Sequence, residues 1–344
     1  MSISSKNLSR RGFLKMGGAT SLGLALSACG IPTTKPPATT PSVTQASPTV
    51  TITPGTDRDQ KTRVLRIAHM TDFHVMPNGN APEGMAKALR HAQSQADPPD
   101  LIINTGDSIM DSLGADKSNA EAQWQVFQDI LKAENKLPIF HAIGNHDVWG
   151  WGRQDAETQN DPLYGKNMAL EKLGLQERYY SFDKAGWHFV VLDSNHLPNE
   201  VSGGSYIGKL DDEQFSWLEN DVAQVDGSTP VCVVSHIPIL CACEFFDGPN
   251  EETGAWVVPA AWMHIDARRF RGLYLEHPNI RLCLSGHSHQ HESLDYLGVK
   301  YLTDGAVCGN WWNGAYLDFP PAYVLVDLYD DGSAESLFVP YEQG

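Results

Sequence analysis

Five short apolar segments of this chain each lead into a residue that can bind a metal ion, and this pattern constrains the fold more than any other. The segments that resemble strands cover residues 64–71, 100–105, 138–143, 231–235 and 280–285. They are followed, in order, by Asp-x-His, Gly-Asp, Gly-Asn-His-Asp, His and Gly-His-x-His. In open α/β sheets, ligands gather outside the carboxyl ends of the strands. The sequence therefore predicts a sheet-based domain with a single polar site at its strand ends.

Helical periodicity alternates with these strands in the first half of the domain. The spacing of apolar residues predicts helices over 81–96, 119–134, 211–225 and 264–277. Further strands are expected at 179–182, 187–192 and 323–328. Strands that alternate with helices and are followed by more strands indicate an α/β domain with mixed sheets.

The polar residues at the strand ends are of types that suit a transition metal. Asp72 and His74 are two residues apart, as are His287 and His289, so an extended chain would place each pair on one side. Glycines precede three of the motif residues and allow the backbone to turn sharply and approach closely. Carboxylate oxygen combined with imidazole nitrogen suits Mn, Fe or Zn, whereas an all-oxygen set would suit Mg or Ca.

Each of these signals has an ordinary structural explanation when it is taken alone. An Asp-x-His is commonly a surface or cap feature, a Gly-Asp is commonly a turn, and His236 before Ile-Pro could be a core histidine. Five such signals in this order, each after an apolar strand, favour a shared site instead.

The ordered set resembles the calcineurin-like metallophosphoesterase superfamily, whose motifs are D-x-H, G-D, G-N-H-[DE], H and G-H-x-H. The resemblance covers the chain from about residue 63 onward and extends to residues 189–194, 208–218 and 304–312. It implies a four-layer α-β-β-α sandwich with two mixed sheets and a dinuclear metal site at the strand ends. It also implies hydrolysis of phosphate mono- or diesters by in-line attack of a metal-activated water.

The resemblance assigns a role to each motif residue. The implied ligands form two groups joined by a bridging carboxylate: Asp72, His74 and His289 for the first ion, Asn145, His236 and His287 for the second, and Asp107 for both. His146 would protonate the leaving oxygen or hold the phosphate. Asp147 is expected either to support His146 or to cap a turn.

Departures from related patterns narrow the expected subclass. No arginine follows Gly106-Asp107, which argues against a protein serine/threonine phosphatase, and the first motif is not the D-x-x-Y of purple acid phosphatases. A single-domain phosphodiesterase or phosphomonoesterase is expected. The alternative is a lipid-anchored binding protein that retains the fold with little turnover, although the complete motif set favours an enzyme.

Loop tryptophans either stack a nucleobase or pack the loops onto the domain. These are Trp149, Trp151, Trp311 and Trp312.

The first 60 residues have the composition of a delivery segment. Arg10 and Arg11 precede a short apolar run at residues 16–26, as in twin-arginine export signals. Residues 26–29 resemble a lipoprotein cleavage box that would place a lipid on Cys29; the alternative is a short amphipathic helix. Residues 29–60 are rich in Pro, Thr and Ser and are predicted to be a disordered tether before a domain at 61–344. We therefore expect export by the twin-arginine route and anchoring at the outer face of the cytoplasmic membrane or in the periplasm.

Charge limits the partners of the domain. Without residues 1–28, the chain has 21 Lys and Arg residues against 42 Asp and Glu residues. Such an acidic chain is a poor nucleic-acid scaffold, because binding phosphate backbones requires a basic surface. A small phosphate ester at a metal centre is still compatible, since bound cations reverse the local field.

The cysteines permit several arrangements. Cys232 and Cys283 lie in apolar strand-like runs and are expected to be small core residues. Cys241, Cys243 and Cys308 fall in loops, where one disulfide among them is possible in an oxidising compartment. A thiolate metal site is an alternative that the predicted Asp and His ligands make unnecessary.

Overall fold

The structure is a computed structural model that describes residues 61–198, 205–246 and 252–341. The predicted export signal, the Cys29 lipid site and the Pro/Thr/Ser-rich tether lie outside the described residues. No helix in the described part of the chain is both long and apolar enough to cross a bilayer.

The first sheet contains the three strands that precede the early motifs. It has the order β13-β12-β1-β2-β3. Its strands are β1 (Arg63–Met70), β2 (Leu101–Asn104), β3 (Ile139–His141), β12 (Ala322–Tyr329) and β13 (Ala334–Pro340). β1, β2 and β3 are parallel, whereas β12 is antiparallel to both β1 and β13. The sheet is therefore mixed, and the carboxyl ends of its parallel strands meet at one edge.

The second sheet contains the strands that precede the late motifs. It has the order β10-β11-β9-β8-β5-β4. Its strands are β4 (Tyr180–Lys184), β5 (Trp187–Val191), β8 (Val231–Val234), β9 (Ile280–Ser285), β10 (Glu292–Tyr296) and β11 (Val299–Thr303). The four inner strands are parallel and the two outer strands are antiparallel to their neighbours. A separate ribbon joins β6 (Asn195–His196) and β7 (Ile207–Gly208).

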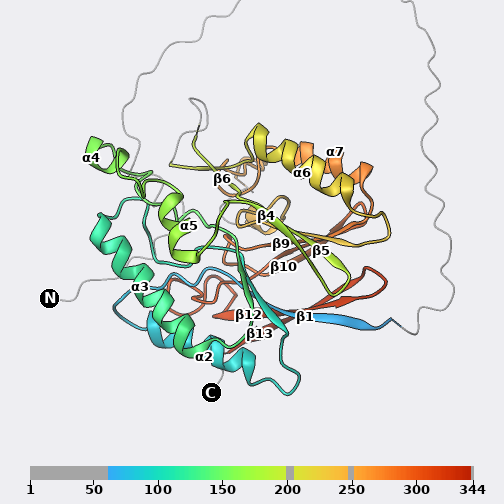
Figure 1. Cartoon of the computed structure of the whole chain (residues 1–344), viewed down its shortest axis with the longest axis horizontal. Coiled ribbons are helices and arrows are strands. Elements are labelled where there is room, and N and C mark those ends of the chain that lie inside the picture. Colours follow the sequence, from blue (N-terminus) through green and yellow to red (C-terminus); the bar gives the residue numbers. More distant parts are fainter. Residues whose placement is uncertain (1–60, 199–204, 247–251, 342–344) are drawn as a thin grey trace, which may run out of the picture. The chain divides into compact units, whose positions relative to one another are not determined.

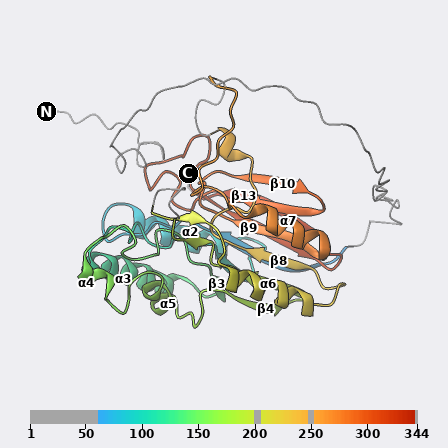
Figure 2. The same cartoon turned by 90° about the horizontal axis from the view of Figure 1, so that it is seen from above.

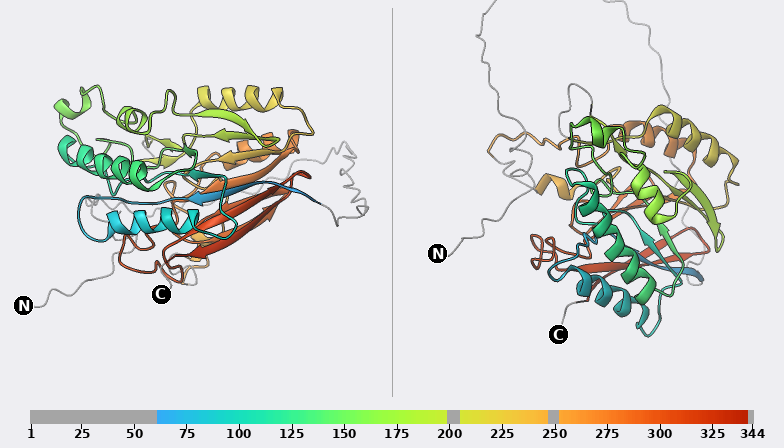
Figure 3. Two further views of the ribbon diagram at one scale, coloured as in Figure 1. Left: turned by 60° about the horizontal axis from the view of Figure 1, so that its bottom comes forward. Right: turned by 60° about the vertical axis from the view of Figure 1, so that its left-hand side comes forward.

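Three apolar clusters hold four layers together. Between the sheets, Ile67 and Val326 of the first pack with Phe189 and Leu284 of the second. The outer face of the first sheet is covered by α2 (Ala81–Gln93) and α3 (Lys117–Glu134), and that of the second by α6 (Asp212–Gln224) and α7 (Ala267–Glu276). Figures 1 and 2 show these two helix pairs on different sides of the strands, and Figure 3 shows the layers from further directions. The expected α-β-β-α sandwich with two mixed sheets is confirmed.

Capping residues explain where the helices start. The Asp116 side chain accepts a hydrogen bond from the Asn119 amide, so α3 begins two residues before its predicted start. Asp211 caps α6 in the same way through the Gln214 amide. The short helices α4 (Ala156–Gln159) and α5 (Asn167–Leu173), the 3₁₀ turn η2 (Cys243–Phe246), the β6–β7 ribbon and β10, β11 and β13 were not expected from the sequence. β10 is largely exposed and β13 is mostly half-buried, so neither has the continuous apolar run of a fully buried strand.

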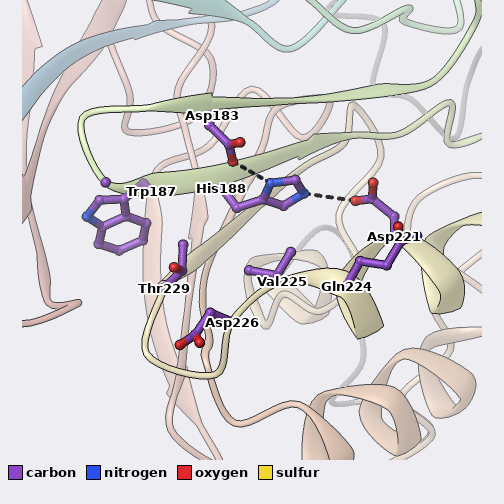
Figure 4. A pocket seen from close by; sticks show the side chains of 9 residues that line it. Asp183, Trp187, His188, Asp221, Gln224, Val225, Asp226 and Thr229 are labelled. Atoms are coloured by element: carbon purple, nitrogen blue, oxygen red, sulfur yellow. Dashed lines mark hydrogen bonds and ion pairs between the residues drawn. The ribbon is translucent and has the colours of Figure 1, made fainter.

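A pocket of about 450 Å³ lies at the edge of the second sheet opposite the motif residues. Its centre is His188 near the start of β5, whose Nδ1 lies 2.7 Å from Asp183 Oδ1 and whose Nε2 lies 2.9 Å from Asp221 Oδ2 (Figure 4). The hydrogen bond to Asp221 raises the pKa of His188, burial opposes it, and Asp183 adds to the increase. The imidazole thus links β4, β5 and α6 through the two carboxylates.

We expect Asp221→Asn to lower the free energy of unfolding by about 1 kcal/mol in mildly acidic solution. The pKa of His188 is raised in the folded protein. The stabilisation by the His188–Asp221 pair is therefore fully present below the pKa of His188 in the unfolded chain, about 6.5, and is lost as the pH rises through its pKa in the folded protein. Urea unfolding at a series of pH values measures the difference. Asp212→Asn, an exposed change on the same helix, is the control, and a pH-independent difference for Asp221→Asn would contradict the proposed ion pair.

Candidate metal centre

The structure brings all seven predicted ligands to one place, where five strands of the two sheets end. β1 leads into Asp72 and His74, β2 into Asp107, and β3 into Asn145. β8 leads into His236, and β9 leads into His287 and His289. Each of the seven side chains is at most 3% exposed, although all are polar.

The first group forms around Asp72, His74 and His289. The His74 Nε2 and His289 Nε2 atoms lie 3.1 Å apart. Asp72 Oδ1 lies 3.3 Å from the His289 Nε2 and 3.7 Å from the His74 Nε2. Three potential donors to a cation therefore converge from two different sheets.

The second group forms around Asn145, His236 and His287. The His236 Nε2 lies 2.9 Å from Asn145 Oδ1 and 3.1 Å from His287 Nδ1. Asp107 stands between the groups, because its Oδ2 is 3.2 Å from the His236 Nε2 and 3.6 Å from the His74 Nε2. A single carboxylate oxygen thus faces both groups, as a bridging ligand must.

The orientation of the imidazoles shows that a cation fits both groups. The outward ring nitrogen of each histidine faces a backbone carbonyl, at 3.3 Å for His74, 3.0 Å for His236, 2.9 Å for His287 and 2.6 Å for His289. A carbonyl only accepts, so the outward nitrogen carries the hydrogen and the inward nitrogen presents a lone pair. Within the described residues, Asp72 Oδ1 is also buried without a hydrogen-bond donor. These crowded acceptors repel one another unless positive charge lies between them.

The two carboxylates remain ionised in this setting. Burial alone would raise the pKa of Asp72, but His289 and His74 hold it well below its usual range. Burial likewise opposes ionisation of Asp107, and His236 and His146 lower its pKa in spite of this. The centre therefore combines two buried carboxylates with imidazole nitrogens, a donor set that suits Mn, Fe or Zn.

The backbone at the site is strained. Asp72, His74, Asp107, His287 and His289 all have positive φ, between 42° and 71°. Left-handed backbone in residues other than glycine costs free energy and gathers at functional sites. This finding corrects the expectation that each Asp-x-His or His-x-His pair leaves an extended chain on one side. Because the chain turns at each residue, His289 joins the first group and His287 the second.

Two of the motif glycines are required by close approach. A Cβ on Gly144 would lie 2.1 Å from Asp107 Oδ1, and one on Gly286 would lie 1.9 Å from Thr71 Oγ1. Neither position has room for a side chain. The expected role of these glycines is therefore confirmed, and it is to let the strand ends pack against one another.

His146 lies at the edge of the first group. Its ring packs edge-on against His74 with centroids 4.8 Å apart, and its side chain is 19% exposed, more than any of the seven. Its Nδ1 lies 3.4 Å from Asp111 Oδ1. Burial opposes protonation, but Asp107 and Asp111 raise the pKa of His146 to about 9. His146 is thus close to the centre and accessible from outside.

Asp147 does not pair with His146. Its carboxylate accepts hydrogen bonds from the backbone amides of Gly144 and Ser108, at 2.9 Å and 2.8 Å, and so ties the ends of β2 and β3 together. Burial and then Asp107 raise the pKa of Asp147 to about 7. The turn-capping alternative is the correct one, and Asp111 is the carboxylate beside His146. The sequence contained no signal for Asp111, because the contact joins two loops that are distant along the chain.

The loop tryptophans have different positions. Trp149 is 2% exposed within the core beneath the first sheet, and the Trp312 indole donates to the carbonyls of Phe73 and His74. Both pack loops onto the domain. Trp311 is half-buried and lies against the ring of His289, with centroids 4.5 Å apart. Trp311 is therefore an aromatic side chain placed beside the candidate ligands.

Comparison with known proteins decides the family. The model of the calcineurin-like phosphoesterase family matches residues 65–291, which include all seven converging residues and His146. The chain belongs to this family. It is a metal-dependent hydrolase of phosphate esters.

Several curated relatives of this phosphoesterase match most of its length. The 3′,5′-cyclic adenosine monophosphate phosphodiesterase CpdA of Escherichia coli is 24% identical over 280 residues, covering 78% of this chain and 87% of the relative. A 3′,5′-cyclic-nucleotide phosphodiesterase of Nostoc is 21% identical over 283 residues, covering 78% and 90%. Among solved structures, a dimetal phosphatase from Danio rerio superposes with a TM-score of 0.54 at 15% identity, covering 82% of this phosphoesterase and 100% of that chain. The last comparison supports the fold.

Proposed function

We propose that this phosphoesterase hydrolyses 3′,5′-cyclic nucleotides. Hydrolysis at a two-metal centre is supported chiefly by one observation, the position of Asp107 Oδ2 between two groups of buried donor atoms. The substrate class is supported by the two cyclic-nucleotide phosphodiesterases above, each matched over 78% of this chain. Trp311 supplies an aromatic surface beside the centre on which a nucleobase can stack.

The proposed ligands follow the two groups. Asp72, His74 and His289 would hold one ion, and Asn145, His236 and His287 would hold the other. Asp107 would bridge them. When bound, two Mn, Fe or Zn ions supply Lewis acidity to the phosphoryl oxygens and lower the pKa of a water molecule.

The residues of the chain then have three tasks. The carbonyls behind the four histidines hold the tautomers and ring positions. Trp311 positions the base. As water adds to phosphorus and the bond to O3′ breaks, His146 gives its proton to O3′, which leaves as a hydroxyl of the 5′-nucleotide.

The test is turnover by the metal-loaded protein. We expect conversion of 3′,5′-cyclic AMP to 5′-AMP, measured by chromatography. The kcat/KM for this reaction should be well above that for nitrophenyl monoesters. Addition of a chelator should stop the reaction and added Mn or Zn should restore it. Hydrolysis of monoesters alone would overturn the substrate class. Tightly bound metal without turnover of any ester would favour the binding-protein alternative.

Trp311→Ala should raise KM for cyclic nucleotides about tenfold, because base stacking on an aromatic side chain contributes roughly 1–3 kcal/mol. The KM for bis-nitrophenyl phosphate, which carries no base, is the internal comparison. Trp217→Ala, in the packing of α6, is the control for a general loss of aromatic surface. An equal increase for both substrates would show that Trp311 only orders the site.

We further propose that residues 1–60 deliver the enzyme to the outside of the cytoplasmic membrane. The support is the order of the twin arginines, the apolar run and the Leu-Ser-Ala-Cys sequence that ends at Cys29. Arg10→Lys with Arg11→Lys should leave precursor in the cytoplasm, measured by fractionation. Cys29→Ala should remove labelled fatty acid from the protein, and label retained on this variant would contradict the anchor site.

A further inference from the structure

Two cysteines and a glutamate form a second cluster of ligand atoms, separate from the seven residues above. Cys241 and Cys243 lie in the loop that follows β8 and His236, and Glu292 is the first residue of β10, after His289. One ligand atom from each of the three lies within 4.8 Å of the others. We call these residues the Cys–Cys–Glu cluster.

The two thiols are buried but lie outside the three apolar clusters of the described residues. Cys232 and Cys283 pack in the apolar clusters between and behind the sheets, as the sequence predicted. Cys241 and Cys243 are 1% and 8% exposed, yet neither is a member of the three apolar clusters formed by the described residues. Packing in an apolar cluster therefore accounts for Cys232 and Cys283, and it does not account for Cys241 and Cys243.

The carboxylate of the cluster is held in place by the loop that carries the thiols. Glu292 Oε2 accepts hydrogen bonds from the amide of Ala242 at 2.8 Å and from that of Cys243 at 2.9 Å. These bonds fix the carboxylate beside the sulfur atoms and use only part of its capacity to accept, since each oxygen has two lone pairs. The three ligand atoms are thus preorganised by the backbone.

The local charge is that of a cation site. Glu244, which follows Cys243 directly, is 1% exposed, so a second carboxyl group is buried close to the thiols. Two carboxyl groups, those of Glu244 and Glu292, therefore lie beside the thiols and disfavour the loss of their protons. A divalent cation reverses this effect, because it stabilises thiolates directly.

We propose that Cys241, Cys243 and Glu292 bind a third metal ion of the zinc class, distinct from the phosphoesterase centre. Two thiolates and one carboxylate are ligands that zinc takes in tetrahedral sites, with the fourth position left for Glu244 or water. Binding transfers the protons of the two thiols to solvent and forms two metal–sulfur bonds, with no change of oxidation state. The ion would fasten the loop after His236 to the strand after His289, and so hold the two segments that supply late-motif ligands.

The experiment uses cobalt as a probe of thiolate ligation in the whole protein. The chain is stripped with a chelator under reducing conditions and titrated with Co²⁺. We expect an intense near-ultraviolet thiolate-to-cobalt absorption that Cys241→Ser and Cys243→Ser abolish and that Zn²⁺ displaces. Glu292→Gln should weaken cobalt affinity while retaining the absorption, because the two thiolates that cause it remain. Elemental analysis of the zinc-loaded serine variants should show one ion fewer per chain.

Two controls separate this site from the phosphoesterase centre. Cys308 Sγ lies 3.9 Å from His289 Nδ1, so Cys308→Ser tests whether that sulfur is the source of the absorption. Asp107→Asn removes the proposed bridge and should leave the absorption intact, whatever the substrate of the enzyme proves to be. The circular dichroism spectrum of each variant reports whether it has folded.

Three results would overturn the inference. The first is no thiolate absorption in the reduced wild-type protein. The second is an absorption that disappears in Cys308→Ser and persists in the folded Cys241→Ser variant. The third is a Cys241–Cys243 disulfide in the metal-loaded protein, detected by mass spectrometry after alkylation without reductant.

Discussion

Asp107→Ala is expected to lower kcat for phosphate-ester hydrolysis by roughly 10³-fold or more, and to release metal from the protein. The Oδ2 of Asp107 faces both the His74 and the His236 nitrogens, so its removal weakens both proposed ion sites at once. The substitution also removes the negative charge of the Asp107 carboxylate, which would help to balance the positive charge of the two bound cations. Activity assays and elemental analysis after gel filtration measure the two effects.

Asp111→Asn is the matched control for this change. Asp111 is a carboxylate of the same loop region, but it contacts His146 and none of the seven converging residues. Its variant should retain the metal content of the wild type. Full metal occupancy in folded Asp107→Ala would show that this carboxylate is not a bridge.

His146→Ala is expected to slow hydrolysis of ribose or alkyl esters by about 10²–10⁴-fold. An alkoxide leaves poorly without a proton, whereas a nitrophenolate leaves readily, so the loss for nitrophenyl esters should be much smaller. The position of His146 motivates this expectation: its ring packs on His74, yet it is more exposed than any proposed ligand. The ratio of kcat/KM for the two ester types, at one pH and with saturating metal, gives the effect directly.

Metal content distinguishes the roles that His146 could have. One ligand atom of His146 lies within 4.8 Å of those of His74 and Asp107, so coordination is a real competitor to proton transfer. We expect His146→Ala to keep both ions. Loss of metal would make His146 a ligand, and equal losses of rate for the two ester types would make it a phosphate contact.

The seven converging residues could be predicted from the sequence because each follows a strand with a clear apolar pattern. β2 and β8 are buried throughout, β9 at all but one residue and β1 over its last four residues, so their ends are visible in the sequence. Parallel strands bring such ends to one edge. The division into two groups came from the family resemblance. Periodicity alone placed the side chains of His287 and His289 on one side of the chain, because it assumed extended backbone where φ is positive.

Contacts between loops could not be predicted in this way. Asp111 reaches His146 and Glu292 reaches the Cys241–Cys243 loop across long separations in the chain, and no local pattern marks either contact. The role of Asp147 was ambiguous because its local pattern fits two roles. A carboxylate after a glycine turn can cap the turn or can pair with the neighbouring His146. β10 and β13 were missed because neither is fully buried, so neither forms the continuous apolar run that marks the inner strands.

We propose that one carboxylate, that of Asp107, joins two metal ions at the meeting point of the two sheets. Anomalous diffraction from crystals of the metal-loaded protein, recorded on both sides of the metal absorption edge, tests it most directly. Two peaks are expected within the set of seven residues, with Asp107 in contact with both. One should lie against Asp72, His74 and His289, and the other against Asn145, His236 and His287. A single peak there, or two peaks with Asp107 bound to only one of them, would contradict it.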